Sequence, residues 1–328
     1  MRDESVSWQK ILAQGFRCAN ELLEFLSLPP QLGNLIAEKQ FKTRVPCGFA
    51  ARMQKGNPND PLLLQVLAVN EELQIVENYG LDPLLEASGN PLPGLMHKYQ
   101  GRVLLTLTGS CAINCRYCFR RHFPYQDNNP GRNGWQPILD YIRNDSTIHE
   151  VILSGGDPLL ATDLMLRDLI QQLETIPQVK TLRFHTRIPI VLPERVNKPL
   201  LTLLAATKLR KVIVLHCNHA QELDDKVQQV CSALAKAGCH LLNQAVLLRG
   251  VNDNATVLAK LSEDLFSCGV LPYYLHVLDK VAGAAHFDLP EKTALAIHRQ
   301  LQSILPGYLV PRLAREESGR AHKTLLSN

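Results

Sequence analysis

The sequence predicts an α/β fold in which six βα units form a partial barrel behind a mainly helical N-terminal region. From Arg102 onward, short apolar runs typical of buried parallel strands alternate about six times with amphipathic helical patterns. Polar or glycine-rich segments follow nearly every apolar run, as they do at the active-site end of parallel barrels. The units end near residue 305, so a partial barrel is favoured over a closed ring of eight units.

The apolar runs give the expected strands, and the patterns between them give the helices. The strands are expected at 103–107, 151–153, 182–184, 212–215, 241–248 and 273–278. Helical spacing of apolar residues appears within 164–173, 223–234, 257–265 and 294–304. Thr162 and Asn254 are candidate N-caps, and Pro290 lies near the start of the last helix.

Three regions follow from this reading: residues 1–100 are mainly helical, 101–305 form the barrel, and 306–328 form a C-terminal segment. In the first region one amphipathic helix is expected over 12–26, ended by Pro29 and Pro30, and a second over 31–42. Shorter helices are expected at 50–55 and 62–69, between segments rich in Pro and Gly.

Composition excludes several classes of partner. The chain of 328 residues has a net charge of +4 and no basic block, so no nucleic-acid partner is expected. No apolar run is long enough to cross a membrane, and the charged N-terminus lacks the apolar core of a signal peptide. We expect a cytoplasmic protein that does not bind membranes, in which the nine cysteines are thiols or metal ligands.

The most informative motif is a group of three cysteines, Cys111, Cys115 and Cys118, at spacings of four and three. A disulfide uses two thiols and a structural zinc site uses four ligands. Three thiolates suit a [4Fe-4S] cube in which one iron keeps an open position for a small molecule. A zinc site completed by a distant histidine, or three core thiols, are the alternatives.

The cysteine spacing, with Tyr117 before the third cysteine, resembles the signature of radical S-adenosylmethionine (SAM) proteins. In that family the open iron binds SAM, and an electron from the cluster produces a deoxyadenosyl radical. The resemblance implies that Ser154, Gly155, Gly156 and Asp157 hold SAM, with the aspartate accepting from an ammonium group. On residues alone, these glycines are equally consistent with a tight βα turn.

A narrower resemblance, over about residues 94–324, is to the lysine 2,3-aminomutase branch of this family. The stretches that carry it are 94–99, 111–121, 153–157, 187–193, 243–253, 272–274 and 307–311. It implies conversion of L-lysine to β-lysine with a [4Fe-4S] cluster, SAM and pyridoxal phosphate (PLP), together with an electron donor. The stretch from Cys115 to Tyr125 is most similar to the subgroup linked to β-lysylation of elongation factor P.

The resemblance also implies roles for residues around PLP. Lys323, after the single glycine Gly319, stands where the family has its Schiff-base lysine, although longer members have several glycines there. Lys98, Tyr99 and Arg102 match a segment that holds the cofactor, and cations suit a phosphate. His216 and Gln244 are candidate cofactor contacts or, alternatively, buried hydrogen-bonding residues.

For the substrate, Arg120 matches the carboxylate-binding arginine of the family, and Asp279 and Glu316 match acids that meet the distant ammonium of lysine. Asp279 could instead cap a helix or pair with Lys280, and Glu316 could be a solvated charge. A glutamate 2,3-aminomutase and a zinc-stabilised binding module without turnover are the alternative functions. Because no cysteine follows Cys268, we expect no C-terminal structural zinc.

Overall fold

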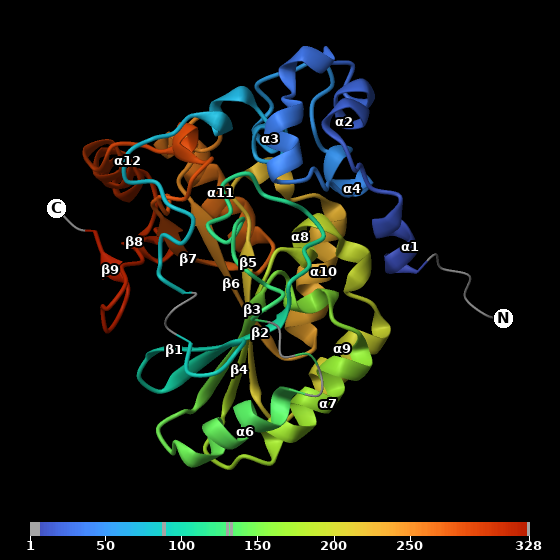
Figure 1. The fold of residues 1–328 in the computed structure, drawn as a ribbon, viewed down its shortest axis with the longest axis vertical. Coiled ribbons are helices and arrows are strands. Elements are labelled where there is room, and N and C mark those ends of the chain that lie inside the picture. The colour runs from blue at the N-terminus through green and yellow to red at the C-terminus, as the bar shows by residue number, and fades with distance from the viewer. Residues whose placement is uncertain (1–6, 87–89, 129–130, 132–133, 327–328) are drawn as a thin grey trace.

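The structure is a computed structural model that describes residues 7–86, 90–128, 131 and 134–326. Within these residues one continuous nine-stranded sheet has its strands in chain order, from β1 to β9 (Figure 1). Strands β2 to β8 pair in parallel, and β1 and β9 add antiparallel strands at the two edges. The bounds are β1 Leu95–Tyr99, β2 Arg102–Thr108, β3 Glu150–Gly155, β4 Thr181–Thr186, β5 Arg210–His216, β6 Cys239–Val246, β7 Leu271–His276, β8 Arg312–Arg315 and β9 Thr324–Leu325.

The six strands expected from the sequence correspond to β2–β7, so the predicted α/β class with its parallel barrel strands is confirmed. The described residues also contain β1, β8 and β9, which the sequence analysis did not predict. β8 extends the parallel series beyond residue 305, because Tyr274 and Leu275 of β7 pair with Arg312 and Leu313.

The strands are joined by helices that cover the outer face of the sheet (Figure 1). They are α6 Trp135–Asn144, α7 Asp163–Glu174, α8 Ile188–Val191, α9 Lys198–Ala206, α10 Asp225–Lys236, α11 Ala255–Ser267 and α12 Glu291–Ile304. The expected caps are present, since Thr162 accepts from the Met165 amide and Asn254 accepts from the Val257 amide. The sequence analysis missed α6 and α9.

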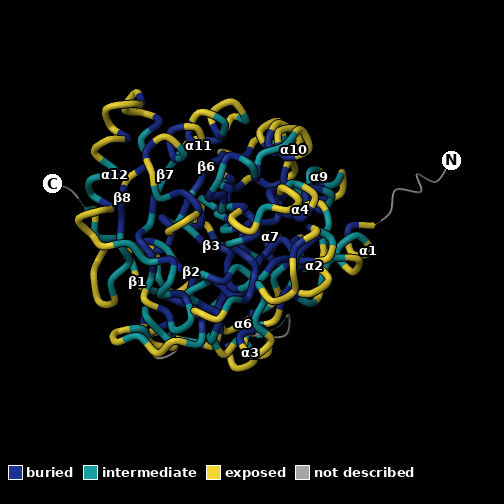
Figure 2. The backbone as a smooth tube through the Cα atoms, turned by 90° about the horizontal axis from the view of Figure 1, so that it is seen from above, coloured by how far each residue is buried: buried dark blue, intermediate teal, exposed yellow. Residues whose placement is uncertain are grey.

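One row of side chains shows how the barrel core is built. Leu105, Leu153, Phe184, Ile213 and Leu241 are paired neighbours on five successive strands, and all are buried. Because side chains alternate along a strand, the residues next to this row point to the opposite face, where the cavity described below lies. Figure 2 shows the buried stretches gathered in the strands, with exposed stretches around them.

The N-terminal region contains the short helices α1 Trp8–Ala13, α2 Ala19–Phe25, α3 Leu35–Gln40, α4 Cys47–Ala50 and α5 Pro61–Leu64. The prediction of one helix over 12–26 is wrong, because α1 ends at Ala13 and α2 begins only at Ala19. At that break Phe16 forms an antiparallel bridge with Val45. A side chain at Gly15 would come within 2.8 Å of the Val45 carbonyl oxygen, so this crossing requires glycine.

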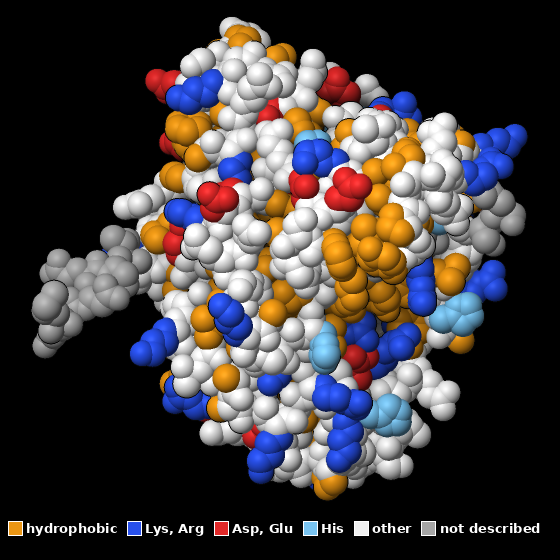
Figure 3. Space-filling view, turned by 180° about the vertical axis from the view of Figure 1, so that it is seen from behind, with side chains coloured by type: hydrophobic (Ala, Val, Ile, Leu, Met, Phe, Trp, Pro, Cys, Tyr) orange, Lys and Arg blue, Asp and Glu red, His pale blue; other side chains and the backbone are white. Residues whose placement is uncertain are grey.

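No helix among the described residues is long and apolar enough to cross a membrane. Figure 3 shows Lys and Arg side chains at several separate places on the rear face of the molecule, with acidic side chains between some of them.

Candidate active site

The three cysteines lie on the loop that follows β2, and the N-terminal region holds this loop in place. Arg44 donates through Nη1 to the Cys111 carbonyl oxygen over 2.7 Å. The Arg116 amide donates to the Gln65 carbonyl oxygen over 2.9 Å. The buried guanidinium groups of Arg116 and Arg121 both pair with Glu72. These arginines therefore brace the loop from inside the protein.

Burial and neighbouring groups act on the thiols of Cys111 and Cys118. Burial, together with the neighbouring Cys115, raises the pKa of Cys118 to about 11. Burial, Cys118 and Asp157 likewise raise the pKa of Cys111. Arg187 donates through Nη1 to Cys115 Sγ over 2.8 Å. Binding of iron would supply the positive charge that three adjacent thiolates require.

The segment at the end of β3 packs directly against the start of the cysteine loop. The Gly156 amide donates to the Thr108 carbonyl oxygen over 2.7 Å, and the Asp157 amide donates to Ser110 over 2.8 Å. A Cβ atom on Gly156 would lie 2.3 Å from the Ser110 carbonyl oxygen. Gly155 has a φ of +108°, which a larger residue rarely adopts. The glycines are therefore required for close backbone approach beside the cysteines.

Asp157 has several hydrogen-bond partners within the protein. Its carboxylate accepts from Thr186 Oγ1 and from the amides of Leu159, Arg187 and Ile188. Burial raises its pKa to about 6 despite these bonds. The carboxylate accepts from four donors and so orders the turn after β4. The sequence analysis expected it to accept from the ammonium group of a ligand.

His216 and Gln244, the last residues in register on β5 and β6, contact each other. Gln244 Nε2 lies 2.8 Å from His216 Nε2. Burial, with Arg187 and Arg120 nearby, lowers the pKa of His216 to about 3, so its ring is neutral. The two residues form a partly buried hydrogen-bonded pair, and Gln244 also lines the central cavity, where it stays a candidate cofactor contact.

A central cavity of about 920 Å³ opens at this end of the barrel, a volume suited to a cofactor with a small substrate. It brings together many of the predicted site residues: Lys98, Tyr99, Arg102, Arg120, Ser154, Gln244, Glu316 and Lys323. Further lining residues that sequence reasoning missed include Glu86, Arg183, His185, Tyr274, Arg312 and Arg320. Its charged lining is mostly cationic, which suits a phosphate and a carboxylate.

Lys323 enters this cavity from the C-terminal segment, just before β9. Its Nζ forms an ion pair with Glu316 and lies 5.8 Å from the centre of the Tyr274 ring. Glu316 also accepts from the Tyr99 hydroxyl over 2.8 Å and lies 3.7 Å from Lys98 Nζ. Burial alone would raise the pKa of Glu316, but these partners, with Lys323 foremost, lower it to about 2. Glu316 is therefore a half-buried, ionised acid, and Tyr99 contacts it directly.

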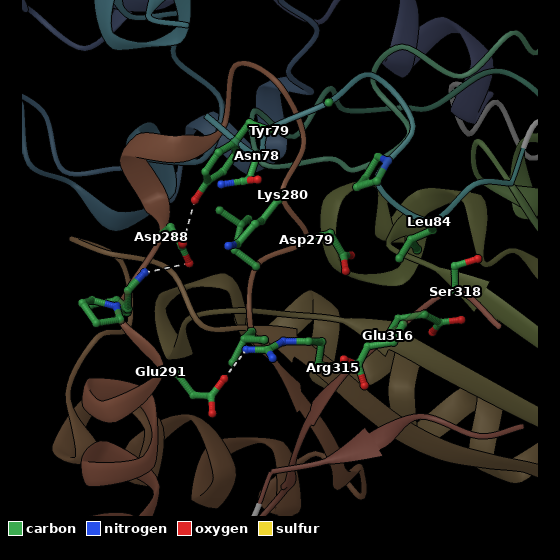
Figure 4. A pocket seen from close by; sticks show the side chains of 17 residues that line it. Asn78, Tyr79, Leu84, Asp279, Lys280, Asp288, Glu291, Arg315, Glu316 and Ser318 are labelled. Atoms are coloured by element: carbon green, nitrogen blue, oxygen red, sulfur yellow. Dashed lines mark hydrogen bonds and ion pairs between the residues drawn. The ribbon is translucent and has the colours of Figure 1, made fainter. Parts of the chain in front are cut away.

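Asp279 lies in an adjacent cavity of about 880 Å³ that shares Glu316 and Leu84 with the central cavity. Figure 4 shows Asp279 and Glu316 directed into this space, from the segments after β7 and β8. Burial and the Glu316 carboxylate raise the pKa of Asp279 to about 7. Two acids that repel each other in this way form a site for a cation.

Arg120 lines the central cavity from the loop after Cys118. It donates through Nη1 to Ser154 Oγ over 3.1 Å. Its Nε and Nη2 atoms donate to the two oxygens of Glu86 over 2.6 and 3.1 Å. A lone acid in an irregular segment gave no signal in the sequence, so this pairing was not foreseen.

Known proteins resemble this chain over nearly its whole length. Residues 100–188 match the family model described as a 4Fe-4S single cluster domain. The L-lysine 2,3-aminomutase of Haemophilus influenzae is 48% identical to this chain, over 98% of this chain and 96% of its own length. That of Escherichia coli is also 48% identical, over 97% of this chain and 94% of its own length. That of Clostridium subterminale is 34% identical over 97% of this chain and 77% of its own. A solved radical SAM methyltransferase from Sphaerobacter thermophilus aligns with a TM-score of 0.44 at 15% identity, over 67% of this chain and 68% of its own. This chain belongs to the lysine 2,3-aminomutase family of radical SAM proteins.

Proposed function

We propose that this protein is an isomerase that moves the α-amino group of L-lysine to C3, giving β-lysine. The observation that carries the proposal is the pair of acids, Asp279 and Glu316, beside Lys323 in a site whose other charges are mostly cationic. Lysine presents a carboxylate at one end and an ammonium at the other, and this charge distribution complements both. The near-full-length similarity to L-lysine 2,3-aminomutases supports the same substrate.

The residues fit the cofactors of such a reaction. Cys111, Cys115 and Cys118 would hold the [4Fe-4S] cluster, and the backbone of Ser154 to Gly156 would hold SAM close to it. Lys323 would attach PLP covalently, with Lys98 and Arg102 as candidate phosphate contacts from the lining of the central cavity. When bound, the cluster and SAM supply a carbon radical that takes a hydrogen atom, and PLP supplies the carbonyl group that carries nitrogen between carbons.

The ion pair between Lys323 and Glu316 links the attachment of PLP to the binding of substrate in this proposal. As long as Lys323 is free, its ammonium pairs with Glu316. If PLP is attached at Nζ, this nitrogen would belong to an imine, and Glu316 would lose its ammonium partner. Glu316 is then available to a different cation, and the ammonium at the far end of lysine is the chemical match.

Arg120 and Asp279 would fix the two ends of the substrate. The planar guanidinium of Arg120 suits the substrate carboxylate, and Asp279 would share the distant ammonium with Glu316. Glutamate would bring a third carboxylate to these two acids. Since burying an unpaired charge is costly, the site should reject glutamate strongly.

The test is anaerobic reconstitution with iron, sulfide, SAM, PLP and reductant, followed by product analysis with L-lysine and with L-glutamate. The proposal expects a brown protein with a PLP absorbance band and β-lysine as the product. A preference for L-glutamate would support the glutamate aminomutase instead. A colourless, zinc-containing protein without turnover would support a binding module.

We further infer that the β-lysine serves the modification of elongation factor P. The support is the similarity of the stretch from Cys115 to Tyr125 to the subgroup with that role. Deleting the gene in the source organism should leave elongation factor P without the added β-lysyl mass. An unchanged mass would contradict this link while leaving the aminomutase activity intact.

A further inference from the structure

Glu86 is a buried acid in the central cavity to which neither the sequence motifs nor the proposed reaction assigns a role. It is 4% exposed and precedes β1 in an irregular segment. Its carboxylate contacts two cations that the proposed function uses for different ligands. Arg120 donates to it through Nε and Nη2, and Lys98 Nζ lies 3.0 Å from its Oε1 atom.

The way Glu86 holds Arg120 leaves the outer edge of the guanidinium with longer, weaker contacts that a ligand could replace. A guanidinium has five N–H donors in a fixed plane, and Glu86 takes one from Nε and one from Nη2 along one side. Nη1 and the other Nη2 hydrogen form the outer edge of the plane. At that edge, Nη1 donates to Ser154 Oγ over 3.1 Å and to the Gly155 carbonyl oxygen over 3.5 Å, and Nη2 has a 3.9 Å contact with Met96 Sδ. A second carboxylate could bind to this edge while Glu86 stays in place.

Displacement of Glu86 by the substrate is the less favourable arrangement. An acid this deeply buried would lose both of its cationic partners, and leaving such a charge unpaired is strongly unfavourable. Burial alone would raise its pKa, yet Arg120 and Lys98 lower it, so the group is a carboxylate at neutral pH.

The backbone before Glu86 is strained in a way that fixes its direction. Leu85 has a φ of +52°, the left-handed region that costs a residue with a side chain about 1 kcal/mol. The Glu86 amide donates to Asp82 Oδ1 over 3.0 Å and closes this turn. The Leu85 side chain is exposed, so its packing does not offset the strain. The consequence of the turn is that the Glu86 side chain points into the protein.

We propose that Glu86 is a positioning residue that orients the guanidinium of Arg120 so that its outer edge receives the substrate carboxylate. The proposal rests on the proposed function, because it takes the ligand of Arg120 to be the carboxylate of an amino acid. The shared contact with Lys98 also joins the carboxylate site to the candidate phosphate site, so one acid orders both.

The test compares two ligands that differ only in the carboxylate. L-lysine and 1,5-diaminopentane have the same two amines, and only lysine can use Arg120. Binding of each is measured by calorimetry to the PLP-loaded protein without reductant, so that no turnover occurs. In Glu86→Gln an amide NH2 group replaces one of the two oxygens that accept from Arg120, so one of these two hydrogen bonds is lost. Lysine affinity should fall about tenfold or more, while diamine affinity stays within about twofold.

Turnover gives a second measurement. Glu86→Gln should raise the KM for lysine about tenfold while kcat changes little, because the contact orients bound substrate before the chemistry. Glu86→Asp keeps the charge but is one methylene shorter, so it should recover part of the lysine affinity. Glu38→Gln is the matched control, since Glu38 is also buried but accepts from the Ala19 amide in the N-terminal region.

The outcomes separate the two proposals. Parental lysine affinity and KM in a folded Glu86→Gln protein would overturn the positioning role alone. Equal loss of lysine and diamine binding would also overturn it, because the effect would then not pass through the carboxylate. If the parent itself does not prefer lysine over the diamine, the proposed function fails, and the positioning role fails with it.

Discussion

The Nη1 atom of Arg187 donates to Cys115 Sγ over 2.8 Å, although the two residues lie on different βα loops. The same guanidinium pairs with the buried carboxylate of Glu222, and its Nη1 also contacts the Tyr117 hydroxyl. Glu222 balances the charge of Arg187, so a permanent cation can remain beside a cysteine in a buried place. A hydrogen bond to a cluster sulfur stabilises the more negative, reduced state of an iron-sulfur cluster.

Arg187→Gln should therefore lower the reduction potential of the cluster. The loss of one charge-assisted hydrogen bond corresponds to roughly 50–100 mV for a single electron. An anaerobic redox titration followed by electron paramagnetic resonance measures it. Arg195→Gln is the control, because this buried arginine instead donates to the Leu159 and Ala161 carbonyl oxygens. Equal potentials in the parent and Arg187→Gln would show that the contact does not influence the cluster.

Cys115→Ala should abolish SAM cleavage and most of the bound iron, because a cube with two protein thiolates is poorly held. Iron analysis and the release of 5'-deoxyadenosine measure the two effects. Cys268→Ala is the control, since that cysteine lies after α11, away from the loop after β2. Full iron content and activity in Cys115→Ala would disprove the assignment of the three cysteines.

Lys323→Ala should no longer form a stable adduct with PLP after borohydride reduction. The reason is that Lys323 is the lysine placed beside Glu316 and the Tyr274 ring. Mass spectrometry of the digested protein locates the adduct in the parent. Lys280→Ala, which changes a lysine lining the adjacent cavity, should keep it. An adduct found on Lys98 or Lys280 would refute the assignment.

Asp279 should make lysine binding depend on pH. Its folded-state pKa is raised to about 7, and the substrate ammonium needs the ionised form. Lysine affinity should therefore rise as the pH increases from 6 through about 7 and then level off. Calorimetry with the parent and Asp279→Asn tests this. The variant should bind lysine more weakly and lose the dependence, and an unchanged pH profile would contradict the role.

The same raised pKa has an effect on stability. Between the unfolded pKa near 3.8 and the folded value near 7, the folded chain binds more protons than the unfolded chain at Asp279. Stability from this group is therefore lost as the pH rises through that window. Asp279→Asn should raise the Tm of the ligand-free protein more at pH 8 than at pH 5. Equal changes at both pH values would contradict a carboxylate that is partly buried and repelled by Glu316.

The sequence predicted those parts of the fold that depend on long local patterns. Strands β2–β7 are apolar runs, and the caps at Thr162 and Asn254 are local signals. β8 and β9 are short, at Arg312–Arg315 and Thr324–Leu325. β8 forms by pairing with β7, and β9 by pairing with β8, so neither has a long local pattern. The break at Phe16 likewise depends on Val45, which no local pattern reveals.

Site residues that belong to a sequence motif could be predicted. Site residues whose role depends on a contact with a distant part of the chain could not. The cysteine spacing and Lys323 are visible in the sequence. Glu86 and Arg187 matter through partners 34 and 72 residues away, so their roles appear only in the folded chain. Asp157 shows the reverse case, since its motif suggested a ligand contact and its carboxylate caps a turn.

The most direct test of the central claim uses L-lysine labelled with ¹⁵N at the α-amino group. The reconstituted protein is supplied with SAM, PLP and reductant, and the product is examined by NMR for the carbon that carries ¹⁵N. A 2,3-aminomutase must deliver the label to C3 of β-lysine without loss to ammonia. Label that stays on C2, or that appears as free ammonia, would contradict the account.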